Sequence, residues 1–340
     1  MTGLKRHVRA LSAAVAVAAG FAIAGHAANA ETKIRVGFSV IPIHLQPLIF
    51  KEGAGIAKHQ GKSYSVEMIH FGGSSQQLTA MAAGELDISV LAFSTFAAGV
   101  VNAKQDIVAL GDVARDGPEF STVYAVKEDS PIKSVKDLKG KVLAINGKGG
   151  AVDMAARIVL LKDGLKPGVD VNIVEARFGA MEAMVRQGKT DVAVLLAPFW
   201  AKAKAAGGLR PLFYQRDGLG STQFLLFAAK KDYVAKNRAV LVDWMEDYIR
   251  GTNWLLDLKN RDKALAMTAA ATKQKPENFA SWAFQKGSDY YHDPKGMVDV
   301  KAFQSNVDDL HKLGILRQTI DVSKYVDHSI AQEAAKRLGM

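Results

Sequence analysis

Cysteine is absent from the 340-residue sequence, and this absence excludes several kinds of chemistry. Without thiols the chain forms no disulfide framework and offers no cysteine nucleophile. A lipid-modified N-terminal cysteine is excluded for the same reason. The Gly-x-Ser-x-Gly elbow and the His-Glu-x-x-His motif are missing as well. We therefore predict that the protein is not an enzyme.

Recognisable metal-ligand spacings are also missing. Six histidines follow residue 30, and we expect neither a metal site nor a cofactor from them: His44, His59, His70, His292, His311 and His328. His44 is the one histidine in a turn that we expect near a ligand, and there it would serve as a hydrogen-bond partner.

Long apolar runs are scarce. The longest, Ala10–Gly25, follows three basic residues and precedes Ala28-Asn29-Ala30, which has the small-x-small form of a cleavage site. We therefore expect an export signal over residues 1–30, removed after Ala30, and a soluble mature protein in a Gram-negative periplasm. The run is shorter than the roughly 18 residues of a membrane span, and the alternative is an N-terminal anchor helix.

A strong charge of one sign is missing too. The chain has 44 Lys and Arg against 34 Asp and Glu, for a net charge of +10. A modest lysine cluster at 133–148 lacks interleaved aromatic residues, so we predict no nucleic-acid partner. The mild positive field instead favours the capture of anionic solutes.

The most informative pattern runs from Val66 to Gly99. It predicts a strand over 66–70, a Gly-Ser turn with hydroxyl N-caps, a helix over 76–83, a left-handed stop at Gly84 and a buried strand over 88–92. Ser94 and Thr95 follow that strand and begin another helix. Two helix N-termini thus lie beyond the carboxyl ends of neighbouring parallel strands, where open α/β sheets bind ligands.

A similar unit recurs at Val171–Trp200, where Gly188-x-x-Asp191 repeats the Gly84-x-x-Asp87 pattern. The plain interpretation is that βαβ units resemble one another. The alternative that we favour is a pair of α/β lobes that face each other across a cleft. The roughly 310 residues after the signal suffice for two cores.

A glycine-rich turn, Asn146–Gly150, separates a predicted strand at 142–145 from a helix that continues to about Leu161. It leaves backbone N–H groups free at a positive helix end. It is neither a P-loop nor a dinucleotide fingerprint, because the required glycine and Ser/Thr positions are not met.

The other predicted elements are strands and late helices. Strands are expected at 33–39, 107–113, 122–126, 209–214 and 224–228, with a polar turn at 216–223. Helices are expected at 240–254, 261–271, 276–286, 300–313 and 329–338, and their aromatic residues are expected in the core.

The order of these parts resembles one family. The pieces that carry the resemblance are the export signal, the Arg-Val-Gly-Phe first strand, Asp-Ser-Pro-Ile-Lys-Ser-Val-Lys-Asp-Leu-Lys-Gly-Lys at 129–141, and a late Leu-Gly-Ile segment at 313–315. The chain resembles periplasmic substrate-binding proteins of nitrate/sulfonate/taurine-type ABC importers. The resemblance implies a type II periplasmic binding fold with a two-strand hinge. One lobe would comprise 31–122 and 225–340, and the other 123–224.

The resemblance places ligand contacts in the turns named above. The residues implied are Val40, His44, Gln46, Gly73, Ser74, Ser75, Phe93, Ser94, Thr95, Gly147, Lys148, Gly149, Gly150, Pro198, Phe199, Trp200, Thr222 and Gln223. Many relatives have an aspartate where this chain has Ala197, so an ammonium group lacks one counter-charge. The aromatic residues suggest an apolar or aromatic body on the ligand, although Trp200 could instead pack behind its turn.

The resemblance therefore implies a monomeric binding protein that captures a small organic anion, a sulfonate or carboxylate, by hinge closure. Its partners would be an inner-membrane ABC permease and ATPase. Alternatives are nitrate, a thiamine-precursor-like heterocycle, or an enzyme on the same fold. The sequence does not identify the ligand.

Overall fold

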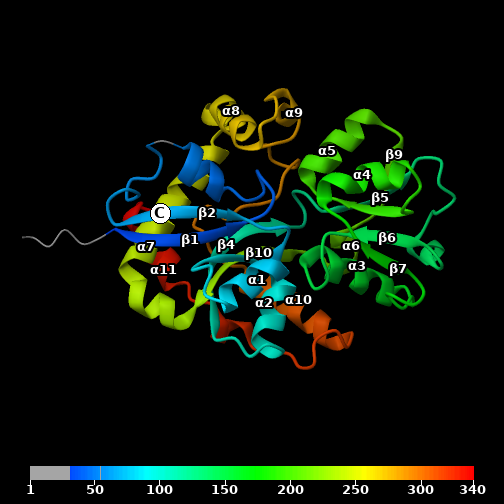
Figure 1. Ribbon diagram of the computed structural model, residues 1–340, viewed down its shortest axis with the longest axis horizontal. Coiled ribbons are helices and arrows are strands. Elements are labelled where there is room, and N and C mark those ends of the chain that lie inside the picture. The colour runs from blue at the N-terminus through cyan, green and yellow to red at the C-terminus, as the bar shows by residue number, and fades with distance from the viewer. Residues whose placement is uncertain (1–30, 54) are drawn as a thin grey trace, which may run out of the picture. The chain divides into compact units, whose positions relative to one another are not determined.

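The computed structural model describes residues 31–53 and 55–340, and the predicted export signal at 1–30 lies outside them (Figure 1). Strand β1 (Thr32–Phe38) pairs in parallel with β2 (Tyr64–His70). A second sheet has the order β3 (Ser89–Ala92), β10 (Thr222–Lys230), β4 (Ile107–Asp116), and both of its pairings are antiparallel. A bridge between Val36 and Ile88 places β1 beside the start of β3. The predicted parallel pairing of the 66–70 and 88–92 strands is therefore wrong, because β1 lies between them.

A five-stranded sheet comes from the middle of the chain. Its order is β7 (Asn172–Glu175), β6 (Val142–Ile145), β8 (Val192–Leu195), β5 (Val123–Lys127), β9 (Leu209–Tyr214). Strand β6 is parallel to β7 and β8, whereas β5 is antiparallel to β8 and β9. The apolar runs of β6 and β8 are buried, as expected of central strands covered on both faces.

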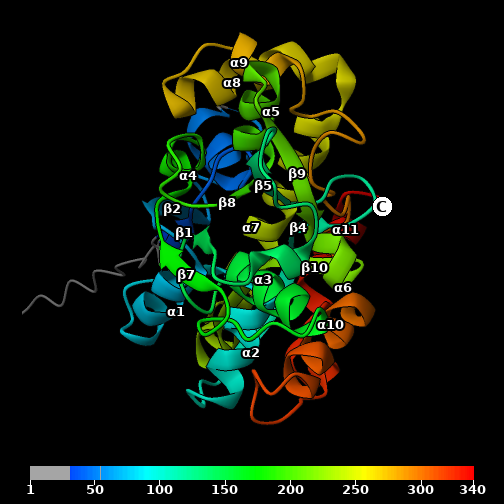
Figure 2. The same cartoon turned by 90° about the vertical axis from the view of Figure 1, so that its right-hand side faces the viewer.

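Helices cover both groups of sheets (Figures 1 and 2). The helices are α1 (Ser74–Ala82), α2 (Phe93–Val101), α3 (Ala151–Lys162), α4 (Phe178–Arg186), α5 (Ala197–Ala206), α6 (Gln215–Leu219), α7 (Lys231–Leu256), α8 (Arg261–Thr272), α9 (Glu277–Ala280), α10 (Val300–Lys312) and α11 (Ser329–Arg337). Short π or 3₁₀ turns occur at Leu48–Glu52, Val135–Leu138, Leu258–Asn260 and Val322–Tyr325. Among the described residues, no helix has the length and apolar character needed to span a membrane.

The chain crosses twice between the two groups of strands. The first crossing runs from the end of β4 at Asp116 to the start of β5 at Val123, and the second runs from the end of β9 at Tyr214 to the start of β10 at Thr222. In Figure 1 the green five-stranded sheet with α3 to α6 lies beside the remaining strands. The division into lobes at 122/123 and 224/225 remains a prediction, and residues 31–340 form one compact unit.

An aromatic cluster fills the core beneath the long helix α7. The ring of Phe227 lies edge-on to Trp244 and Tyr248, with centroids 4.8 and 4.7 Å apart, and Phe50 stacks on Trp244 at 5.8 Å. The prediction that late aromatic residues belong to the core is confirmed for Trp244 and Tyr248, which are buried.

Three predicted elements are wrong in detail. The expected helix at 276–286 ends at Ala280, and Phe284 beyond it has a positive φ of 56°, which a helix excludes. The expected polar turn at 216–223 contains α6. Gly73 precedes α1 without any side-chain cap, so the serine hydroxyls do not serve there as N-caps. The left-handed stop at Gly84 is confirmed by a φ of 77°.

Candidate functional site

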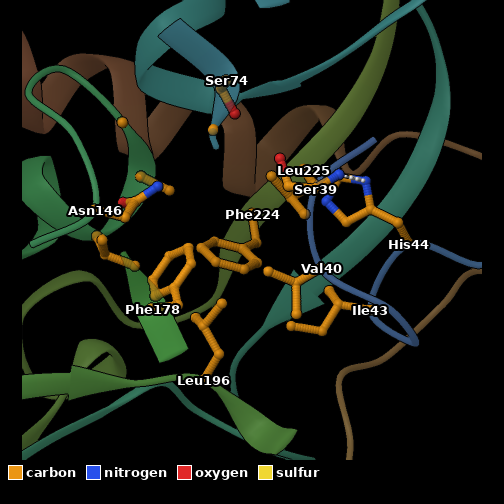
Figure 3. A pocket seen from close by; sticks show the side chains of 14 residues that line it. Ser39, Val40, Ile43, His44, Ser74, Asn146, Phe178, Leu196, Phe224 and Leu225 are labelled. Carbon is orange, nitrogen blue, oxygen red and sulfur yellow. Dashed lines mark hydrogen bonds between the residues drawn. The ribbon is translucent and has the colours of Figure 1, made fainter. Parts of the chain in front are cut away.

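A small cavity lies where the turn after β1 meets the starts of α1 and α3, and its volume is about 40 Å³. Val40, His44, Gly73, Ser74 and Gly150 line it, and all five belong to the predicted site. Figure 3 shows Ser74, Asn146, Ser39 and His44, with Leu225 among them, around one side of the cavity, while most of the apolar side chains gather on the other. The site thus has a polar half and an apolar half.

Two helix N-termini open into this cavity. Gly73 precedes α1 and Gly150 precedes α3, and neither helix start has a side-chain cap. The first N–H groups of a helix have no partner within the helix and carry partial positive charge. Ser74 Oγ instead accepts a hydrogen bond from the backbone N–H of Ala92 at 3.0 Å, which fixes α1 to the end of β3.

His44 is buried in a neutral form at the cavity wall. The backbone N–H of Ser39 donates to His44 Nδ1 at 3.3 Å, so the ring proton must sit on Nε2. Burial, which disfavours the charged imidazolium, is the main cause that lowers the pKa of His44 to about 3. The imidazole therefore offers one hydrogen-bond donor and no charge at neutral pH.

The other half of the cavity is apolar. The aromatic rings of Phe178 and Phe224 line it together with Val40, Ile43 and Leu196. Phe178 stacks on Phe199 with centroids 6.0 Å apart, and Phe224 stacks on Tyr290 at 5.2 Å. Neither a carboxylate nor a cation lines the cavity among the described residues.

Three predicted hydroxyl groups lie outside the cavity and join the starts of α1 and α2 to the loop before α3. Ser94 Oγ and Thr95 Oγ1 each donate to the backbone oxygen of Gly149 at 3.1 Å, and Ser75 Oγ donates to that of Lys148 at 2.9 Å. Gly149 has a φ of 78°, a backbone conformation that favours glycine. We call Ser75, Ser94 and Thr95 together with the 148–149 carbonyls the clasp. In this structure these hydroxyl groups form hydrogen bonds within the protein.

The remaining predicted residues do not line the cavity. Gln46 and Phe93 are buried in the core, Gly147 and Lys148 belong to the loop before α3, and Pro198, Phe199 and Trp200 occupy the first turns of α5. Thr222 and Gln223 begin β10, where Gln223 Nε2 donates to Asp112 at 2.7 Å and its Oε1 accepts from the backbone N–H of Asp299. Gln223 is therefore part of a buried network at the second crossing.

The lining residues that were not predicted as site residues are Ser39, Ile43, Asn146, Ala151, Val152, Phe178, Leu196, Phe224 and Leu225. Three of them lie just after the carboxyl end of a strand of the five-stranded sheet: Asn146 after β6, Phe178 after β7 and Leu196 after β8. That position was the available signal, because ligands of open α/β sheets bind there. Phe224 carried no such signal, since it lies inside β10.

A family model described as the NMT1-like family matches residues 27–269. The chain belongs to this family. An aliphatic sulfonates-binding protein, so described, of Escherichia coli (strain K12) is 26% identical over 254 residues, which cover 73% of this chain and 74% of that protein. The predicted relationship to nitrate/sulfonate-type substrate-binding proteins is thereby confirmed.

Solved structures show the same fold. The periplasmic nitrate-binding protein NrtA from Synechocystis PCC 6803 has a TM-score of 0.71 at 16% identity, with 91% of this chain and 89% of that one covered. The alkanesulfonate-binding protein SsuA from Xanthomonas axonopodis pv. citri, bound to MOPS, has a TM-score of 0.70 at 19% identity and covers 88% of this NMT1-like chain and 99% of its own. The desulfurization enzyme DSZB has a TM-score of 0.62 at 13% identity, with 91% and 100% covered. The predicted periplasmic binding fold is confirmed.

Proposed function

We propose that this protein is the periplasmic solute-binding component of an ABC importer and that it captures a small organic anion between α1 and α3. The observation that carries the proposal is a cavity that the described residues line with two uncapped helix starts and with no charged side chain. Free N–H groups and aligned peptide dipoles favour an anion at such a place. A sulfonate or carboxylate would accept hydrogen bonds from both helices and from His44 Nε2.

The apolar half of the cavity would hold the rest of the ligand. Phe178, Leu196 and Phe224 offer carbon surface, which suits an alkyl or aryl group better than nitrate, all of whose outer atoms are polar. A ligand with an ammonium group would meet no carboxylate among the described residues that line the cavity. The preferred ligand is therefore an anion without a positive charge.

The expected affinity is micromolar. Hydrogen bonds to a charged group contribute roughly 1.5–3 kcal/mol each. Three or four of them, reduced by the costs of immobilisation and closure, leave about −8 kcal/mol, which corresponds to a micromolar Kd. A cavity of about 40 Å³ holds only a few water-sized groups. Ethanesulfonate would require a slightly wider separation of the walls, supplied by a hinge motion at the two crossings.

An enzymatic role finds no support in the cavity. His44 Nδ1 accepts the backbone N–H of Ser39 and so is not placed to take a proton from a serine hydroxyl there. Ser74 Oγ is engaged with the backbone of Ala92. A nucleophile needs a base within hydrogen-bond reach, and these two serines have none in the described residues. We therefore propose a binding protein that presents its closed form to a permease.

Thermal-shift and calorimetric titrations of the mature protein test this function. The compounds are ethanesulfonate, benzoate, nitrate, an aminopyrimidine, and taurine, which equals ethanesulfonate with an added ammonium group. We expect ethanesulfonate or benzoate to raise the melting temperature, since a ligand that binds only the folded state stabilises it. Ethanesulfonate should bind at least about tenfold more tightly than taurine, a difference of about 1.4 kcal/mol. Tighter binding of nitrate or of the aminopyrimidine would favour the alternatives, and binding of none of the anions would overturn the proposal.

A further inference from the structure

A second and much larger hollow lies outside the cavity, with a volume of about 470 Å³. It lies between α5 and the segment that follows α9, and Figures 1 and 2 both show α5 and α9 side by side. Three separate parts of the chain line it: Phe120 in the first crossing, the 197–205 face of α5, and residues 281–288. Small-molecule sites commonly have volumes of about 300–1,000 Å³, so the size of this hollow suits a ligand.

An aromatic wall separates the hollow from the cavity. Phe224 lines the cavity and stacks on Tyr290, whose ring lies edge-on to Phe120 at 4.9 Å, and Phe120 lines the hollow. Likewise Leu196 lines the cavity, while its neighbour Ala197 lines the hollow. The two spaces therefore lie back to back and have different walls.

The α5 side of the hollow combines an alanine floor with the cation of Lys204. Ala197, Ala201 and Ala205 recur every four residues and share one helix face, with Trp200 and Lys204 beside them. Lys204 forms no ion pair with another described residue, whereas Lys202 on the same helix pairs with Glu182 at 3.6 Å. None of the described residues that line the hollow carries a carboxylate. Its charge therefore favours an anionic occupant.

Each wall of the hollow carries an indole ring. Trp282 is buried and held in place, because its Nε1 donates to the backbone oxygen of Asn278 at 3.0 Å. Trp200 is half-buried, and its ring stacks on no other aromatic ring of the described chain. A half-exposed indole without an aromatic partner is available to stack on a planar ligand.

We propose that this hollow is a second binding site, for a planar aromatic monoanion such as an arenesulfonate or arenecarboxylate. The ring would lie against Trp200 and over the alanine floor, and the acid group would lie near the Lys204 ammonium. Ser281 and Ser288 on the other wall would supply hydroxyl donors. The site does not depend on the function proposed for the cavity, because none of these residues lines the cavity.

Titration with 2-naphthalenesulfonate, followed by calorimetry and by tryptophan fluorescence, tests the proposal. The uncharged isostere 2-naphthalenesulfonamide is the matched probe. Two of the four tryptophans of the chain line the hollow, so a stacked naphthyl ring should quench a large part of the emission. We expect the sulfonate to bind about fivefold or more tightly than the sulfonamide, because a hydrogen-bonded charge adds to the stacking.

Variants locate the bound probe. Lys204→Gln should remove the preference for the sulfonate, and Trp200→Ala should weaken both probes about tenfold. Lys202→Gln is the matched control and should change neither affinity. Ala151→Pro, which alters the cavity, and saturating ethanesulfonate should leave naphthalenesulfonate binding unchanged. Three results would overturn the second site: displacement of naphthalenesulfonate by ethanesulfonate, weaker naphthalenesulfonate binding in Ala151→Pro, or equal naphthalenesulfonate affinities in wild type and Lys204→Gln. Failure of ethanesulfonate to bind would bear only on the cavity.

Discussion

The hydroxyl of Ser94 donates a hydrogen bond to the backbone oxygen of Gly149, 3.1 Å away, and this bond joins the start of α2 to the loop before α3. Thr95 donates to the same oxygen, so one backbone carbonyl accepts hydrogen bonds from two hydroxyl groups of α2. These residues were expected to bind the ligand. Their contacts instead favour a role in closure of the predicted lobes, since each bond exists only while α2 lies against the loop before α3.

Removal of the clasp should weaken ligand binding without any change in the cavity lining. Either hydroxyl alone still donates to the Gly149 carbonyl, so Ser94→Ala and Thr95→Val singly should change ligand affinity little. The double variant should weaken binding about tenfold, which is the effect of roughly one or two neutral hydrogen bonds. Calorimetry with the tightest compound of the panel measures this. Thr272→Val, which removes a hydroxyl bonded only within α8, is the control. Equal losses in the control and the double variant would contradict the role of the clasp.

The size of the cavity should respond to Phe178. Its ring lines the apolar half, is only half-buried, and stacks on Phe199, so Phe178→Ala should enlarge the space at a modest cost in stability. Two further methylene groups gain roughly 1.6 kcal/mol when buried. The ratio of butanesulfonate to ethanesulfonate affinity should therefore rise about tenfold in Phe178→Ala. An unchanged ratio in competition calorimetry would remove Phe178 from the ligand site.

Burial of neutral His44 should cost stability in acid. Its pKa in the folded protein is lowered to about 3, so the unfolded chain takes up a proton below pH 6.5 that the folded protein does not. This contribution to stability is complete above pH 6.5 and is lost as the pH falls towards the folded pKa. Between pH 7 and pH 5 the loss is about 2 kcal/mol. Urea unfolding of His44→Asn should lack this loss, and parallel curves for wild type and variant would contradict it.

Asp289 should change the stability of the protein with pH in the direction opposite to that of His44. Burial is the main cause that raises its pKa to about 6, against hydrogen bonds from the backbone N–H groups of Tyr290 and Phe284, which lower it. The folded protein therefore takes up a proton at a pH where the unfolded chain does not, and this contribution to stability is lost as the pH rises through about 6. Relative to Asp289→Asn, wild type should gain about 1 kcal/mol between pH 7 and pH 5. A gain in the variant as large as that in wild type would show that another group is responsible.

Local pattern predicted much of the fold. The strand at 142–145 and the helix after Gly150 follow from an apolar run and a glycine turn, and β6 and α3 lie there. Strand order was not predictable in this way, because pairing of β1 with β2 and of β3 with β10 joins segments far apart in sequence. The expected helix at 276–286 ends at Ala280, and the positive φ of Phe284, which no composition signal indicates, excludes a helix at that residue.

The candidate site was predictable where a residue follows the carboxyl end of a strand. His44, Ser74 and Gly150 line the cavity, as the turn positions suggested. Ser94 and Trp200 lie in the first turns of helices that follow strand ends, and the direction of a side chain there depends on packing. Trp200 therefore lines the outer hollow, and Ser94 contacts the backbone of Gly149. Phe224 belongs to a strand interior, and only tertiary structure brings its ring to the cavity.

Calorimetric comparison of wild type with Ala151→Pro tests most directly whether the helix starts hold the anion. Proline is well tolerated at the first residue of a helix, and Gly150 has a φ of −75° and a ψ of 170°, which suits the residue before proline. The substitution removes one N–H at the start of α3 and adds two ring carbons beside the cavity that Ala151 lines. Val300→Pro at the first residue of α10 is the control for proline at a helix start. The account predicts that ethanesulfonate binds Ala151→Pro about tenfold or more weakly, the loss of one hydrogen bond to a charged group, and binds Val300→Pro normally. Unchanged affinity of folded Ala151→Pro would contradict it.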